Sequence, residues 1–145
     1  SVVGFDFGTR KIGVAAGQAL TGSATPLEAL PCTQQKPDWE RIRSILDEWH
    51  PDIVVVGLPL NMDGTESELS RRARRFARQL EGRFGTETRM IDERLSTREA
   101  RERLGPAARK GPDPRIDSVA AVLIIEAFFA GAAGERPEAV EQPDD

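Results

Sequence analysis

A run of four β-branched residues, Ile53 to Val56, is the feature that most constrains what this chain can fold into. Such a run predicts a strand that is buried on both faces, which requires helices on both sides of a sheet. Segments with helical periodicity flank it in the sequence, at 39–49 and from about 66 to 81. The pattern is typical of the α/β class.

The other elements follow from local patterns along the chain. Strands are expected at 2–7, 11–16, 25–30 and 87–91, and further helices at 96–104 and 117–130. Asp38 is expected to cap the helix at 39–49, and Thr65 with Glu68 forms a capping box for the next helix. Three strands followed by alternating helices and strands predict a mixed sheet with helices packed on its faces.

Length and charge predict a single domain with a distinct tail. Residues 1–133 of the 145 are expected to form the domain, and 134–145 to be an acidic, disordered tail. Residues 135–145 hold five acids and one arginine, which account for the whole net charge of −4. Residues 67–115 instead hold 14 basic and 8 acidic side chains. The acidic total therefore does not exclude a nucleic-acid partner.

The sequence predicts a cytoplasmic protein with no membrane partner. It contains no run of 18 apolar residues, which excludes a transmembrane helix. We expect no signal peptide, since the first strand begins at once. The single cysteine, Cys32, cannot form an internal disulfide and is compatible with a reducing compartment.

Three acidic residues stand in or beside the expected strands and helices. Asp6 lies inside the apolar first strand, Glu93 follows the last strand, and Asp117 opens the last helix. If they converged, they would repel one another by about 4 kcal/mol per pair at a separation of about 4 Å. A hard divalent cation would remove this cost and bring hydrolytic chemistry. Each acid also has a structural interpretation, as an ion pair with Arg10, an ion pair with Arg94, and a helix cap, respectively.

A second group of residues is basic and favours contacts with phosphate. The helix after Thr65 carries Arg71, Arg72, Arg74, Arg75 and Arg78 opposite its apolar stripe. A solvated face explains this pattern equally well, but arginine binds phosphate with two parallel hydrogen bonds. Further candidates for phosphate contacts are Arg10, Asn61, Arg94 and Lys110. The single histidine, His50, is interpreted as a helix end and argues against histidine-based catalysis.

Four segments closely resemble the YqgF (RuvX-like) family, in order and over about residues 2–130. They are Gly4–Ala15, Val56–Thr65, Asp92–Thr97 and Asp117–Ala121. The resemblance implies an RNase H-like fold, with a mixed five-stranded sheet in the order 3-2-1-4-5 flanked by helices. Members are cytoplasmic bacterial proteins described as pre-16S rRNA nucleases and as relatives of Holliday-junction resolvases.

The resemblance also implies a mechanism. Asp6, Glu93 and Asp117 would be the catalytic acids and would bind Mg²⁺, or alternatively Mn²⁺, to hydrolyse phosphodiester bonds. Related resolvases carry a further acid three residues after the last of these, whereas this chain has Ala120. The expected function is processing of the 5′ end of pre-16S rRNA during ribosome biogenesis. Ribosome-assembly partners and a monomer or weak homodimer are expected.

Three other functions are compatible with parts of the sequence. A Holliday-junction resolvase would use the same acids on four-way DNA, and would need a symmetric dimer. A non-catalytic nucleic-acid-binding module would keep the arginines but would not need three acids. Asp6 to Thr9 also resembles the phosphate loop of actin-like ATPases, but 145 residues are too few for the two domains that those enzymes need.

Overall fold

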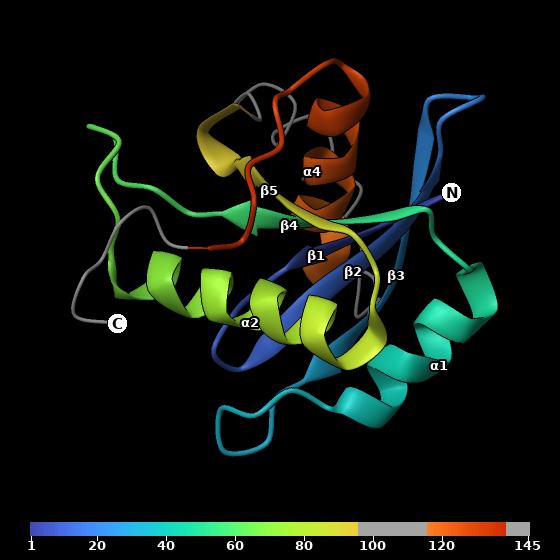
Figure 1. Cartoon of the computed structure of the whole chain (residues 1–145), viewed down its shortest axis with the longest axis horizontal. Coiled ribbons are helices and arrows are strands. Elements are labelled where there is room, and N and C mark those ends of the chain that lie inside the picture. The colour runs from blue at the N-terminus through green and yellow to red at the C-terminus, as the bar shows by residue number, and fades with distance from the viewer. Residues whose placement is uncertain (96–115, 139–145) are drawn as a thin grey trace.

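The computed structural model describes residues 1–95 and 116–138. They form a five-stranded sheet in the order β3-β2-β1-β4-β5, with helices on both faces (Figure 1). The strands are β1 (Val2–Asp6), β2 (Lys11–Gln18), β3 (Ser23–Pro31), β4 (Ile53–Leu58) and β5 (Thr88–Asp92). The helices are α1 (Trp39–Trp49), α2 (Glu68–Phe84) and α4 (Val119–Phe129), with 3₁₀ turns η1 (Glu93–Leu95) and η2 (Ile116–Ser118). The predicted fold class and strand order are confirmed.

The pairing of the strands brings three C-terminal ends to one edge of the sheet. β1 pairs antiparallel with β2 and parallel with β4, and β4 pairs parallel with β5. β3 pairs antiparallel with the outer side of β2. Parallel strands end at the same edge, where α/β proteins place their ligand sites. Because β1, β4 and β5 are parallel neighbours, the predicted site residues at their C-terminal ends can lie close together.

Side-chain alternation along β1 divides the interior into two layers. Val3 and Phe5 belong to the cluster that packs against α1 and α2, together with Phe76. Val2 belongs to the cluster on the opposite face, together with Ile125 of α4. Both faces of the central strands are thus covered, which is why the sequence shows continuous apolar runs there.

The caps of α1 match expectation, whereas the start of α2 does not. Asp38 accepts a hydrogen bond from Arg41 N, and His50 ends α1 in the left-handed conformation. Helix α2 begins later than predicted, with Ser67 and Ser70 forming the capping box. The predicted Thr65–Glu68 box is wrong because the Thr65 hydroxyl donates instead to Asp63.

The C-terminal elements also differ from expectation. Helix α4 starts at Val119, because Ile116–Ser118 form a 3₁₀ turn before it. The helix expected at 96–104 lies outside the described residues. No helix in the described part of the chain is both long and apolar enough to cross a membrane.

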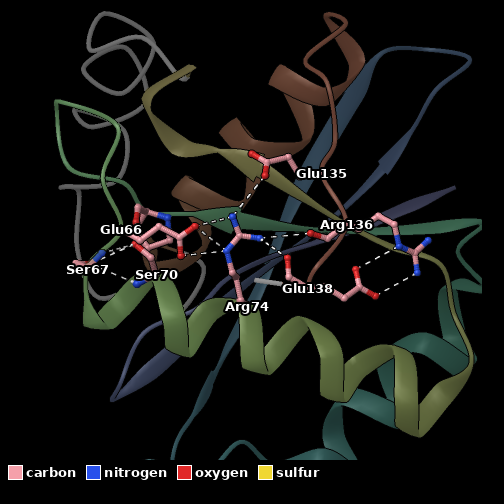
Figure 2. A network of polar contacts seen from close by, with 8 residues as sticks. Glu66, Ser67, Ser70, Arg74, Glu135, Arg136 and Glu138 are labelled. Carbon is pink, nitrogen blue, oxygen red and sulfur yellow. Dashed lines mark hydrogen bonds and ion pairs between the residues drawn. The ribbon is translucent and has the colours of Figure 1, made fainter. Parts of the chain in front are cut away.

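The expectation of a disordered tail does not hold for residues 134–138. Glu135 and Met90 exchange backbone hydrogen bonds of 2.7 and 2.9 Å, which attaches this segment to β5. Arg74 of α2 also contacts this segment, as Figure 2 shows. Its guanidinium donates to the carbonyl oxygens of Arg136 and Glu138, at 3.4 and 3.2 Å. Residues 139–145 lie outside the described part.

Arg74 is the largest fully buried side chain of the described residues, and its charge is compensated. Its Nη2 atom lies 2.7 Å from Glu66 Oε2 and 3.4 Å from Glu135 Oε1. Its Nε atom donates to both Glu66 oxygens, at 3.1 and 2.9 Å. A buried guanidinium needs such partners, because an uncompensated buried charge is costly. Arg74 therefore ties the loop before α2 and the C-terminal segment to the helix.

We expect Arg74→Ala to lower the free energy of unfolding by about 2 kcal/mol, the usual range for hydrogen bonds to charged groups. Urea unfolding measures this loss. The exposed Arg78, one turn later on α2, provides a matched control, and Arg78→Ala should change stability by less than about 0.5 kcal/mol. Equal effects of both variants would contradict the structural role of Arg74.

Candidate active site

Asp6 is the last residue of β1 and lies on the α4 side of the sheet. A Cβ atom at Gly4, two residues earlier, would lie 2.6 Å from Ile125 Cγ1 of α4. Residues two apart on a strand point to the same face. Asp6 pairs with Gly13 of β2. On its other side it lies beside Gly57 of β4, because the preceding residues Phe5 and Val56 are paired.

The other two predicted acids lie over these two glycines. A Cβ atom at Gly13 would lie 2.5 Å from the carbonyl oxygen of Asp117. A Cβ atom at Gly57 would lie 2.9 Å from Glu93 Cγ and 3.0 Å from Cδ. The missing side chains thus leave space for the backbone of Asp117 and Ser118 at Gly13, and for the side chains of Ile124 and Glu93 at Gly57. The structure brings segments from β1, η1 and η2 together around the C-terminal end of β1.

A buried serine fixes the position of Asp117. The Ser118 hydroxyl is buried and accepts a hydrogen bond of 2.9 Å from Val14 N of β2. This bond attaches η2 to the strand that carries Gly13. This positioning role of Ser118 was not predicted from the sequence. The only available signal was its place directly after Asp117.

The three carboxylates do not form a closed metal site in this structure. Lys11 Nζ lies 2.9 Å from Asp117 Oδ2, with both side chains substantially exposed. Within residues 1–95 and 116–138, no three His, Cys, Asp or Glu side chains are placed to hold a metal ion. The ligand set of Asp6, Glu93 and Asp117 therefore remains a prediction.

The chemistry of the residues nevertheless fits a hard divalent cation. The donor set consists of carboxylate oxygens, which Mg²⁺ and Mn²⁺ prefer. The glycine at each side of Asp6 leaves room for the Asp117 backbone and the Glu93 side chain to pack there. Lys11 supplies one positive charge at Asp117, the position at which a cation would be expected. A metal ion bound by all three acids would compete with Lys11 for the Asp117 carboxylate.

Arg94 holds the loop after β4 against the end of β5. Its guanidinium donates to both Asp92 oxygens, from Nε at 3.1 and 3.2 Å and from Nη2 at 2.8 Å. Its Nη1 atom donates to the Met62 carbonyl oxygen at 3.2 Å. In the same loop, Asn61 Nδ2 donates to Thr65 Oγ1 at 2.9 Å. Both predicted site residues thus organise the loop that borders the acids.

The pKa of Asp92 lies below its ordinary value of 3.8, chiefly because Arg94 donates hydrogen bonds to the carboxylate. Such a group stabilises the fold fully above its ordinary pKa, and this contribution disappears as the pH falls through the lower folded value. The difference in free energy of unfolding between the protein and Asp92→Asn should stay constant above about pH 5 and shrink below about pH 4. Urea unfolding at a series of pH values tests this, and a pH-independent difference would contradict it.

The predicted phosphate-binding arginines divide into two groups. Arg10, Arg71, Arg75, Arg78 and Arg94 are exposed and remain candidates. Arg74 has only 2% of its side chain exposed and is ion-paired, so its prediction as a phosphate contact is wrong. No local signal in the sequence indicates this, because one of the two glutamates that compensate Arg74, Glu135, lies 61 positions away. Lys110 lies outside the described residues.

Comparison with known proteins identifies relatives of almost the whole chain. Residues 1–131 match the model of the family RuvX, described as Holliday junction resolvase. A protein of Alcanivorax borkumensis is 59% identical over 132 residues, covering 91% of this chain and 97% of the relative. A protein of Escherichia coli O157:H7 is 52% identical over 134 residues, covering 89% and 95%. Both relatives are named as candidate pre-16S rRNA nucleases.

Similar solved structures agree with the RNase H-like fold. Thermus thermophilus RuvC in complex with a Holliday junction substrate superposes with a TM-score of 0.57 at 18% identity. A second structure of the same RuvC gives a TM-score of 0.52 at 20% identity. Each superposition covers 92% of this chain and 98% of RuvC. At this level of identity, the likeness concerns the fold.

Proposed function

Because this chain belongs to the RuvX family, we propose that it is a divalent-metal-dependent nuclease that processes the 5′ end of pre-16S rRNA. The observation that carries this proposal is the placement of Asp6 between Gly13 and Gly57, with Asp117 and Glu93 over the two glycines. Three acids from separate elements at one sheet edge suit metal-assisted hydrolysis. The names of the relatives support pre-16S rRNA as the substrate.

In the proposed mechanism, Asp6, Glu93 and Asp117 hold Mg²⁺, with Mn²⁺ as an alternative. The bound ion would activate water and stabilise the leaving oxygen of the phosphodiester. Asp6 takes the central position, because the elements carrying the other two acids lie on either side of it. Lys11 keeps Asp117 in place before the ion is bound. His50 does not take part as a base, since it lies just before β4, at the opposite end of the parallel strands from Asp6.

The exposed basic residues would hold the substrate by its backbone. We propose that Arg10, Arg71, Arg75 and Arg78 contact phosphates, while Asn61 and Arg94 shape the loop beside the acids. Lys110 is proposed to extend this path. Such phosphate contacts position the strand without reading its sequence.

The protein would act in the cytoplasm as a monomer or weak homodimer, together with ribosome-assembly factors.

Cleavage of four-way DNA is the second candidate. It is supported by the family description and by the fold shared with RuvC, whose structure was solved with a Holliday junction substrate. A resolvase must make two symmetric cuts and therefore needs a dimer with two sites. We propose RNA processing first because the similar curated relatives carry that name.

A cleavage assay with both substrates distinguishes these functions. A pre-16S rRNA 5′-leader fragment and a four-way DNA junction are incubated with the protein and Mg²⁺ or Mn²⁺. We expect metal-dependent cleavage of the RNA at a defined position. Paired symmetric cuts in the junction alone would replace this proposal by the resolvase. Binding of both without cleavage, at any concentration of either metal, would identify a non-catalytic binding module.

A further inference from the structure

A cleft on the other face of the sheet carries several cations and is separate from the acids. Its volume is about 540 Å³, and it lies between α2, the start of α1 and the turn after β3. Phe7, directly after Asp6, lines it. Since successive residues at the end of a strand point to opposite faces, Asp6 and Phe7 face the two different sites. The end of β1 thus borders both.

The charged side chains that line this cleft are all positive, and no acid lies among them. Four cations line it: Lys36, Arg72, Arg75 and Arg83. No acidic residue lines it, and within the described ranges none of the four forms an ion pair. Arg71 and Arg74, on the same helix, are each paired with a glutamate. A concave site with one sign of charge concentrates ligands of the opposite sign.

The floor of the cleft is aromatic and orients one of the arginines. Trp39 stacks on Phe76, with ring centroids 5.7 Å apart and an interplanar angle of 22°. The Arg83 guanidinium lies 4.3 Å from the centroid of the Trp39 ring. Stacking on an aromatic ring holds the guanidinium plane in place before a ligand arrives. The site therefore combines apolar surface with an oriented cation.

The rim of the cleft is formed by a turn with unfavourable backbone geometry. Thr33 and Lys36 exchange backbone hydrogen bonds of 3.1 and 2.9 Å. The two residues between them, Gln34 and Gln35, have φ values of 53° and 64°. Such turns favour Asn and Gly, and side chains like glutamine rarely adopt this region. The Gln35 side chain accepts a hydrogen bond from Arg72, so the strained turn places an amide among the cations. Strain of this kind is concentrated at functional sites.

We propose that this cleft binds a single-stranded nucleic acid. The four cations would contact successive phosphates, and the aromatic floor with the glutamine amides would receive a base. A duplex would bind poorly, because its bases are stacked inside and cannot enter a cleft. A role of the cleft in cleavage rests on the proposed nuclease function. Binding of a single strand by the cleft does not depend on that function. A strand that lies in the cleft would leave it at the end of β1, beside Asp6.

The test measures binding without cleavage. Asp6→Asn protein in EDTA is titrated into fluorescent oligonucleotides of about 12 units, a length in the range of such sites. The probes are single-stranded RNA, single-stranded DNA of the same sequence, and the RNA duplex. Fluorescence anisotropy gives the affinity at several salt concentrations. Either single strand should bind at least about tenfold more tightly than the duplex, as expected when one base stacks.

Matched double variants separate the cleft from general charge. Arg72→Ala with Arg83→Ala removes two cations of the cleft, and Arg41→Ala with Arg43→Ala removes two exposed cations of α1. Arg43 stacks on Phe84 as Arg83 stacks on Trp39, so the pairs also match in cation–π contacts. The cleft double should weaken single-strand binding about tenfold or more. Its salt slope should fall by about 1.4, since each phosphate contact with a single strand contributes about 0.7.

Two results would overturn the cleft as a binding site. One is an equal loss of affinity in both double variants, and the other is equal affinity for strand and duplex. Arg83→Lys keeps the charge but cannot stack as a guanidinium does. A single-strand affinity between those of the unchanged protein and Arg83→Ala would support a role for guanidinium stacking. Thermal melts confirm that each variant is folded. Because binding is measured with an inactive protein and no metal, failure of the nuclease assay would leave the cleft standing, and the reverse also holds.

Discussion

Replacing Asp6 by asparagine is expected to lower the rate of cleavage by more than about 100-fold while the protein stays folded. Removing a residue that only hydrogen-bonds to a metal ligand already lowers metal affinity or activity by about 10–100-fold. Asp6 is proposed to be the central ligand itself, so its loss should have a larger effect. The substitution keeps the shape of the side chain and removes one negative charge from a group of acids. Stability should therefore be unchanged or slightly higher.

Cleavage of the RNA leader and thermal unfolding, measured side by side, check both parts of this expectation. Asp47→Asn is the matched control, because Asp47 is exposed on α1 and lies away from the acids. The control should cleave at the normal rate. Full activity of Asp6→Asn would remove Asp6 from the catalytic site. A protein that no longer folds would show that Asp6 has a structural role instead.

Gly13→Ala is expected to lower the free energy of unfolding by about 3 kcal/mol and to reduce cleavage strongly. The new Cβ atom would lie 2.5 Å from Asp117 O and 3.2 Å from Ser118 Cα, and both are backbone atoms that cannot simply rotate away. Overpacking of this kind costs about 1–3 kcal/mol, occasionally more. The 3₁₀ turn η2 must move, which breaks the bond from Val14 N to Ser118 Oγ and displaces Asp117.

Gly82→Ala provides the opposite result in the same assay. Gly82 lies in α2, and nothing lies within 4 Å of a Cβ atom added there. Alanine in an exposed helix should stabilise the protein by about 0.5 kcal/mol. Chemical denaturation of both variants, together with their cleavage rates, tests the close packing of η2 on β2. A stable and active Gly13→Ala protein would contradict it.

Much of the fold could be predicted from local patterns. The β-branched run at Ile53–Val56 identified a central strand, and Asp38 with His50 defined both ends of α1. The strand order followed from the family resemblance. The central strand and the ends of α1 were predicted correctly because each depends on residues close together in the sequence, where periodicity and capping act directly.

Features that depend on distant residues could not be predicted in this way. Ser118 contacts β2 across 104 positions in the sequence, and its place after Asp117 does not identify Val14 as its partner. Arg74 was grouped with its exposed neighbours, but Glu66 and Glu135 compensate its buried charge. The cleft unites Phe7, Trp39 and Arg83 from three separate elements. Sequence patterns show which residues are charged, but only the packing of elements shows which charges are compensated.

The central claim is that Asp6, Glu93 and Asp117 together bind a divalent cation. The most direct test is the thermal stability of the protein and of Asp6→Asn during titration with Mg²⁺ and Mn²⁺. The protein should be stabilised by about 1.4 kcal/mol when the metal reaches about ten times its Kd, and Asp6→Asn should show little or no stabilisation. A melting temperature that does not change with either metal, or that rises equally in Asp6→Asn, would contradict the claim.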